Sequence, residues 1–198
     1  MATGVKVVLV DRAPQGLDAD SVLSTNASGS AEAVRHLAAS GHRRIAFLGD
    51  DRSISTAQLR LAGYRAAVQA LGLDDDTSLV MQDVRDSEAA EAAASELLAR
   101  PDGPTALFTA RNTITIGVIR ALRHARLQQR VALVGFDEVP LADLLDPSVS
   151  VIAQDITAIG QLAARLLFQR LAGDDSPYRE HLIPTRLICR GSGEITPP

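Results

Sequence analysis

Hydrophobic residues along this chain fall into two alternating kinds of segment. The first kind is a short, continuous apolar run rich in β-branched residues, which is typical of a strand buried in a sheet. Runs of this kind lie at residues 5–10, 45–49, 79–82, 106–109, 131–136 and 149–153. Because their hydrophobicity is continuous rather than alternating, they predict a parallel sheet that is covered on both faces.

The second kind of segment carries apolar residues at helical spacing. Ala31, Val34 and Leu37 share one predicted helical face, for example, and Gly41 follows as a stop signal. Segments with this spacing lie at residues 31–38, 61–71, 90–98, 114–122 and 156–171. The regular alternation of strands and helices predicts right-handed βαβ crossovers and a doubly wound α/β fold. The first strand begins almost at the first residue, so we expect the sequence to be the back part of something larger.

Composition narrows the class of protein. The 198 residues are 46% hydrophobic and 22% charged, which is typical of a globular protein and excludes a disordered or fibrous one. With 20 basic and 24 acidic residues, the formal charge of −4 does not suit a surface that binds duplex DNA. The single cysteine, Cys189, excludes an internal disulfide framework and favours a reducing cytoplasm. The apolar runs are shorter than a membrane span, so we expect no membrane partner.

Sequence motifs do not favour an enzyme. The chain contains neither GxxxxGK[ST] nor GxGxxG followed by a helix, and it lacks the GxSxG hydrolase elbow. Its four histidines are scattered, which disfavours a zinc site. Because the motifs and the zinc spacing are both missing, we expect no enzyme activity, no cofactor and no metal. A remote alternative is a phospho-accepting or hydrolytic domain in which Asp11, Asp50 and Asp51 hold Mg²⁺. A receiver domain of that kind also needs a lysine after a later strand, and the only lysine is Lys6.

Several polar residues follow predicted strands or open the next helix. Ligands of open α/β sheets bind outside the carboxyl ends of the strands. The residues found there are Asp11, Asp50, Arg60, Arg111, Asn112, Asp137 and Glu138. A guanidinium with a few amides and carboxylates suits a hydroxyl-rich or carboxylated small molecule. Each residue also has a purely structural explanation, because Arg60 could pair with an acid, Asn112 could cap a helix and Asp137 could close a turn.

Short motifs occur in a fixed order along the chain. Residues 36–49 read HLAASGHRRIAFLG, and residues 60–64 read RLAGY. They are followed by PTALF at 104–108, VALVGFD at 131–137 and PTRLI at 184–188. These blocks resemble those of the LacI/GalR family of transcriptional regulators, and together they cover nearly the whole chain.

The resemblance implies an N-terminally truncated piece of a larger regulator. Full-length members have a DNA-binding helix-turn-helix, a hinge, and a two-lobed effector-binding core of the type I periplasmic-binding-protein-like fold. This chain is expected to start inside that core. The implied divisions are residues 1–23 as a remnant of the N-terminal lobe, 24–152 as the C-terminal effector-binding lobe, 153–183 as a crossover and helix of the N-terminal lobe, and 184–198 as the return strand and tail.

The resemblance also implies ligand-binding residues. Arg60 falls on an arginine that members of the family often use to hold effector. Asp137 matches the acid of their GFD motif, and Gln154 matches a glutamine at the crossover between lobes.

Three further positions depart from the family pattern in whole or in part. Asn112 stands where the family usually has an acidic residue that binds sugar hydroxyls, and Arg111 occupies the preceding position, which is commonly Asn. Asn26 retains the second residue of a usual Asp-Asn pair, whose first residue is here Thr25. An amide in place of a carboxylate weakens a clamp on hydroxyl groups.

A homodimer is implied as well, with Ile116, Leu144 and Leu145 at its apolar seam, although ordinary core packing explains these residues equally well. The leading hypothesis is therefore the effector-binding and dimerisation part of a LacI/GalR-type regulator, acting through effector-linked closure of two lobes. Its effector would be a carbohydrate or related polar metabolite, and it would contact DNA only through a domain outside this sequence. The alternative is a truncated lobe that binds no effector and only self-associates.

Overall fold

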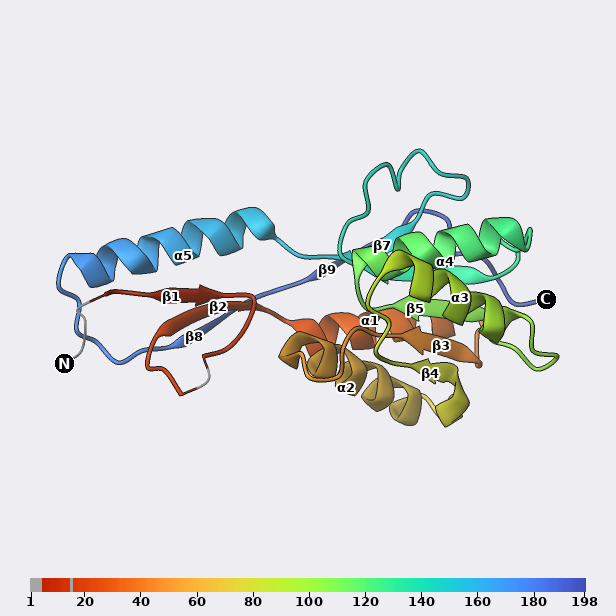
Figure 1. Ribbon diagram of the computed structural model, residues 1–198, viewed down its shortest axis with the longest axis horizontal. Coiled ribbons are helices and arrows are strands. Elements are labelled where there is room, and N and C mark those ends of the chain that lie inside the picture. Colours follow the sequence, from red (N-terminus) through yellow and green to blue (C-terminus); the bar gives the residue numbers. More distant parts are fainter. Residues whose placement is uncertain (1–4, 15) are drawn as a thin grey trace. The chain divides into compact units, whose positions relative to one another are not determined.

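The computed structural model describes residues 5–14 and 16–198, and the chain divides into two compact units (Figure 1). The small unit comprises the chain up to Thr25 together with Gln154–Thr185. The large unit comprises Asn26–Ala153 together with Arg186–Pro198. Each unit has its own sheet.

A six-stranded sheet forms the centre of the large unit. Its strand order is β4-β3-β5-β6-β7-β9, and neighbouring strands are parallel except for the antiparallel pair β7 and β9. The strands are β3 (Ile45–Leu48), β4 (Val80–Met81), β5 (Ala106–Thr109), β6 (Ala132–Phe136), β7 (Ser150–Ala153) and β9 (Arg186–Ile188). Every residue of β3, β5, β6 and β7 is buried, which confirms the strands predicted from continuous apolar runs.

Helices cover both faces of this sheet in two pairs. They are α1 (Asn26–Ala39) with α2 (Ser55–Ala70), and α3 (Ser87–Leu98) with α4 (Asn112–His124). A short 3₁₀ helix, η1 (Thr77–Leu79), precedes β4. The five predicted helices are all present, and the doubly wound α/β fold is confirmed for this unit.

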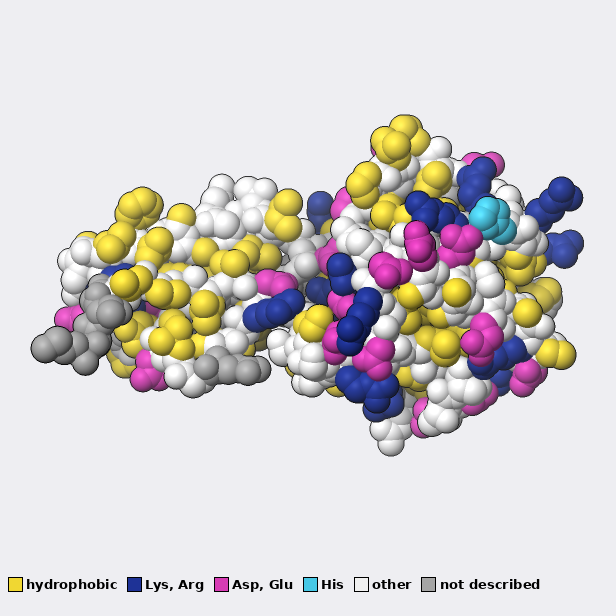
Figure 2. All heavy atoms as spheres, in the orientation of Figure 1, with side chains coloured by type: hydrophobic (Ala, Val, Ile, Leu, Met, Phe, Trp, Pro, Cys, Tyr) yellow, Lys and Arg dark blue, Asp and Glu magenta, His cyan; other side chains and the backbone are white. Residues whose placement is uncertain are grey.

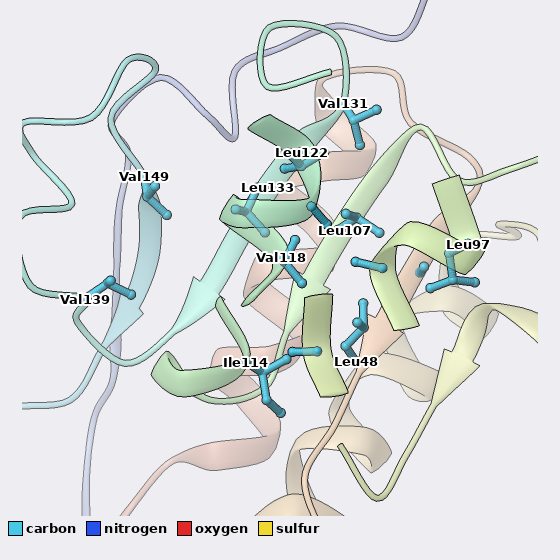
Figure 3. Close-up of a cluster of buried hydrophobic side chains, with 14 of the residues drawn as sticks. Leu48, Leu97, Leu107, Ile114, Val118, Leu122, Val131, Leu133, Val139 and Val149 are labelled. Atoms are coloured by element: carbon cyan, nitrogen blue, oxygen red, sulfur yellow. The ribbon is translucent and has the colours of Figure 1, made fainter. Parts of the chain in front are cut away.

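Alternate residues of the central strands feed two separate hydrophobic cores. On β3, Phe47 joins the core shared with α1 and α2, whereas Leu48 joins the core shared with α3 and α4. Successive side chains of a strand point to opposite faces, so one core lies on each side of the sheet. Figure 3 shows the second core, in which Leu107 from β5 lies close to Val118 from α4.

The small unit is a three-stranded parallel sheet with one helix. The strand order is β1-β2-β8, and α5 packs against β1 and β2. The elements are β1 (Val8–Val10), β2 (Asp20–Ser24), α5 (Ile156–Leu171) and β8 (Glu180–Ile183). None of the helices in the described part of the chain combines the length and apolar character that crossing a bilayer requires.

One expectation about the small unit was wrong, and one of its strands was not expected. The predicted buried strand at residues 5–10 is a strand only over Val8–Val10, where two residues are half-buried and Val10 is exposed. The strand β8 was not predicted, because its exposed and half-buried residues alternate and it lacks a continuous apolar run. Large apolar side chains also remain exposed here, and Figure 2 shows hydrophobic groups gathered over this unit. They include Val10, Leu17, Ile156, Phe168, Leu171 and Leu182.

A buried ion pair connects β2 to the end of α5. Arg170 Nε donates to Asp20 Oδ2 at 2.7 Å, and the two side chains are only 6% and 3% exposed. The Arg170 guanidinium also donates to the carbonyl oxygens of Asp174 and Ser176. The hydrogen bond from Arg170, opposed in part by burial, holds the pKa of Asp20 below its usual value. Because Arg170 bonds both Asp20 and the carbonyl oxygens of Asp174 and Ser176, it fixes the loop that leads into β8.

This pKa shift predicts an acid-sensitive small unit. The folded pKa of Asp20 is lower than its unfolded value of about 3.9, so its ionised form stabilises the fold above that pH and the effect is lost as pH falls through the folded pKa. Asp20→Asn mimics the protonated acid and is expected to cost about 3 kcal/mol at pH 7. Hydrogen exchange of amides in β2 and β8 measures the cost. The difference between wild type and variant should shrink towards zero as the pH is lowered, and a pH-independent difference would contradict the assignment.

A close helix contact gives a second prediction. Gly63 of α2 lies against the backbone of α1, so an added Cβ would overlap the carbonyl oxygen of Ala27. Gly63→Ala is therefore expected to destabilise the large unit by about 1–3 kcal/mol in urea unfolding, despite the better helix propensity of alanine. Ala66→Gly, at an exposed position of the same helix, is the control for propensity and should cost about 1 kcal/mol. A stabilising Gly63→Ala would show that the two helices do not approach so closely.

Candidate functional site

The loops after the central strands meet at one edge of the large unit. Because β3, β5 and β6 are parallel and adjacent, their carboxyl ends lie side by side. Asp50 follows β3, Arg111 follows β5 and Asp137 follows β6 directly. Arg60 comes from α2 and Asn26 begins α1. The fold of the large unit thus brings these five candidate residues from the sequence analysis to the same edge.

Arg60 is the centre of this edge. Its side chain is 7% exposed, and Nε donates to Asn26 Oδ1 at 2.7 Å. Nη1 donates to the carbonyl oxygen of Ala110 at 2.8 Å and lies 3.4 Å from Asp137 Oδ2. The guanidinium carbon sits 3.8 Å above the centre of the Phe136 ring. A cation in this position needs such partners, because an unpaired charge is costly to bury. We call Arg60, Asn26 and Asp137 the Arg60 cluster.

Asp137 reaches Arg60 through an unusual backbone turn. Its φ of 72° lies in the left-handed region, which Asp tolerates better than most residues. The N–H of Asp137 donates to the carbonyl oxygen of Ile152 in β7. The turn therefore starts at the last residue that is still hydrogen-bonded to the neighbouring strand. The side chain is 23% exposed, so the carboxylate contacts both the buried guanidinium and the surface. Asp137 therefore lies at a turn and also pairs with Arg60, and its part in ligand binding stays a prediction.

Arg111 lies on the loop after β5, and Asn112 begins α4. Arg111 Nη1 is 2.6 Å from Asp50 Oδ2, and the two side chains are 39% and 13% exposed. Asn112 Oδ1 accepts a hydrogen bond from the N–H of Thr113, in the first turn of α4. Ala110, whose carbonyl oxygen accepts from Arg60, immediately precedes Arg111. The loop therefore joins the Arg60 cluster to a more exposed ion pair.

Gln154 belongs to the small unit. It accepts a hydrogen bond from the Ser24 hydroxyl there, at the end of β2. The resemblance to the family suggested this residue, and its part in binding stays a prediction.

The residues suggested for a dimer seam have mixed environments. Ile116 and Leu145 are partly buried and pack against the core of α3 and α4, as expected for ordinary core residues. Leu144 is 74% exposed. Their assignment to a dimer interface stays a prediction.

Ion pairs that the sequence did not reveal join the loops after β3 and β4. Arg52 Nε donates to Asp83 Oδ2 at 2.8 Å, and this contact holds the pKa of Asp83 below its usual value. Arg85 lies 2.9 Å from Asp51, whose pKa is lowered mainly by hydrogen bonds from Ser53. Two of the three acids considered for a magnesium site are therefore in ion pairs, since Asp50 contacts Arg111 and Asp51 contacts Arg85, while Asp11 belongs to the small unit. Opposite charges at the ends of neighbouring strands were the signal that could have revealed these pairs.

Comparison with known proteins identifies the class to which this architecture belongs. Residues 34–193 match the family described as "Periplasmic binding protein-like domain". The transcriptional regulator MalR of Streptomyces coelicolor is 32% identical over 99% of this chain and 58% of its own length. A LacI-family regulatory protein from Chloroflexus aggregans superposes with a TM-score of 0.87 at 30% identity, over 93% of this chain and 67% of that one. A complex of the regulator CelR with cellobiose superposes with a TM-score of 0.86 at 31% identity, over 96% and 59% of the two chains.

The fold and these matches define a periplasmic binding protein-like domain. The chain belongs to the LacI family of transcriptional regulators and corresponds to their effector-binding core, which confirms the resemblance found in the sequence. It spans about 58% of the length of the curated relatives it matches. Those relatives are transcriptional regulators rather than enzymes.

Replacing each of the two arginines at this edge is expected to lower the free energy of unfolding by a different amount. Arg60→Gln removes a buried cation from three partners and is expected to cost about 3–5 kcal/mol of unfolding free energy. Arg111→Gln removes a partly exposed ion pair and should cost less than about 1 kcal/mol. Urea unfolding followed by circular dichroism compares the two variants directly. Equal costs would mean that Arg60 does not anchor the edge.

Proposed function

We propose that the carboxyl edge of the large unit binds a neutral, polyhydroxylated effector such as a sugar. The observation that carries this proposal is the Arg60 cluster, in which a buried guanidinium is fixed beside a partly exposed carboxylate. Sugar hydroxyls donate and accept at once, so they can bridge such a pair. The CelR structure that contains cellobiose has the same fold, which supports a carbohydrate-like ligand.

The charges along this edge favour a neutral ligand over an ionic one. Arg60 is matched by Asp137, and Arg111 is matched by Asp50. A carboxylated or phosphorylated ligand would therefore have to displace an acid from its arginine before it gained a charge-assisted bond. A hydroxyl-rich ligand can add hydrogen bonds without breaking either pair.

Preorganisation also supports a binding role for Arg60. Its hydrogen bonds to Asn26 and Ala110 and its contact with Phe136 fix the side chain before any ligand arrives. A long side chain that is already ordered loses little conformational entropy on binding. In the whole regulator, we propose that an effector favours one of two conformations and so alters DNA binding, because a ligand shifts a population towards the state it binds better.

A second candidate function has a specific observation in its favour. The small unit exposes apolar side chains on β1, α5 and β8, such as Val10, Phe168 and Leu182. A surface of this kind suits association with another protein surface. The chain would then self-associate without binding an effector, and no small molecule would change its stability.

Ligand titration distinguishes the two functions. Calorimetry and thermal shift with cellobiose, ribose and other neutral sugars should identify at least one that binds and raises the melting temperature. Arg111→Gln and Asn112→Ala, at the exposed part of the edge, should each weaken that sugar by about tenfold, as expected for one lost hydrogen bond to a charged or polar partner. Arg52→Gln is the matched control, since it removes an arginine from a more exposed ion pair and should bind like wild type.

The contrary results are equally clear. If Arg111→Gln and Asn112→Ala bind the sugar as wild type does, the ligand lies elsewhere. If no sugar stabilises the protein but its sedimentation shows concentration-dependent self-association, the second function is favoured.

A further inference from the structure

A cluster of three chemically different side chains lies at the opposite edge of the large sheet. His36 is in the last turn of α1, Cys189 follows β9, and Glu194 follows a turn near the C-terminus. One ligand atom from each residue lies within 4.8 Å of the other two. Because β9 is antiparallel to β7, Cys189 lies beside the amino end of β7 and not at the carboxyl edge that carries the Arg60 cluster.

The imidazole of His36 points into this cluster through its Nε2 atom. Its Nε2 lies 2.9 Å from Glu194 Oε1, close enough for a charge contact. The same atom is buried, and among the residues that the structure describes it has no partner aligned as a hydrogen bond. A buried polar atom without such a bond is costly, and a cation bonded to it would remove the cost.

The backbone around the cluster is held in place. Ser192 Oγ donates to the Leu133 carbonyl oxygen at 2.6 Å and accepts from the Ser150 N–H at 2.9 Å. The Gly193 N–H donates to Ser150 Oγ. A Cβ at Gly193 would lie 2.9 Å from His36 Nε2, so the tail approaches the imidazole as closely as only glycine allows. His36 and the turn before Glu194 are therefore positioned by the fold.

We propose that His36, Cys189 and Glu194 form a binding site for Zn²⁺. A nitrogen, a sulfur and an oxygen ligand match the donor set of zinc in proteins. Bonds of about 2.0–2.3 Å require ligand atoms about 3.5 Å apart, which small rotations of the exposed Cys189 and Glu194 side chains provide. Three protein ligands leave a fourth position for water.

Binding at this site exchanges a proton for the metal. Partial burial and the neighbouring Glu194 carboxylate, which accepts a hydrogen bond from the thiol, raise the pKa of Cys189. The thiol is therefore protonated in the ion-free protein at neutral pH. Zinc binding releases that proton to solvent and forms the bond between Zn²⁺ and the thiolate sulfur, with no change of oxidation state.

The test uses the full chain, freed of metal with a chelator and kept reduced. Calorimetry should show one Zn²⁺ per chain, and Co²⁺ in its place should give the near-ultraviolet absorption of a thiolate-to-cobalt charge transfer. Cys189→Ser should abolish that absorption and weaken Zn²⁺ by at least about tenfold, and His36→Gln should weaken it similarly. His124→Gln is the matched control, because exposed His124 lies 2.8 Å from Glu91 in a pair with no thiol. It should bind as wild type does.

Several results would overturn the proposal. They are a Zn²⁺ affinity weaker than millimolar, wild-type affinity in Cys189→Ser, and a Co²⁺ complex that lacks the charge-transfer absorption. If His36→Gln does not fold, Cys189→Ser still decides, because Cys189 is exposed. The outcome is independent of the sugar titration, since the two sites lie at opposite edges of the sheet.

Discussion

A buried positive charge at the ends of the central strands organises the large unit. Arg60 is nearly inaccessible, and its guanidinium is stable there only because an amide, a backbone carbonyl and a carboxylate surround it and an aromatic ring lies beneath it. These partners come from α1, from the loop after β5 and from the end of β6. The need to satisfy one cation therefore joins three segments that are distant in sequence, and it fixes the shape of the edge where ligands of parallel α/β sheets bind.

The two edges of the large sheet have contrasting chemistry for the same topological reason. Parallel strands bring all their carboxyl ends together, and there the chain places paired charges that suit a neutral ligand. At the amino edge, the antiparallel β9 returns and carries the C-terminal segment across the end of α1. This return places Cys189 and Glu194 beside His36, although the three residues are far apart along the chain. One antiparallel strand thus creates a place for soft and borderline ligands that a wholly parallel sheet would lack.

Much of the fold could be predicted because burial on both faces leaves a clear trace in the sequence. The runs around Phe47, Phe108 and Val134 became buried strands, and every predicted helix is present. The small unit was harder, because two of its three strands are partly exposed: β1 is shorter and more exposed than expected, and β8 lacks a continuous apolar run. Of the site, the strand ends located Asp137 and Arg111, but only the folded chain shows that Arg60 reaches Asp137 and that Arg111 pairs with Asp50. The cluster at His36 has no local spacing from which it could be predicted.

The amide at position 112 bears on the kind of sugar that the proposed site would select. The resemblance to the family implies an acid at this position, which would accept hydrogen bonds from hydroxyl groups. Asn112 already uses Oδ1 to accept from the first turn of α4, so the side chain offers a ligand chiefly its N–H donors. With Arg111 beside it, this part of the edge is rich in hydrogen-bond donors. A ligand atom that accepts, such as a ring or glycosidic oxygen, therefore fits these donors better than a hydroxyl that must donate. The same fold would therefore bind carbohydrate with a reversed hydrogen-bond polarity at this position.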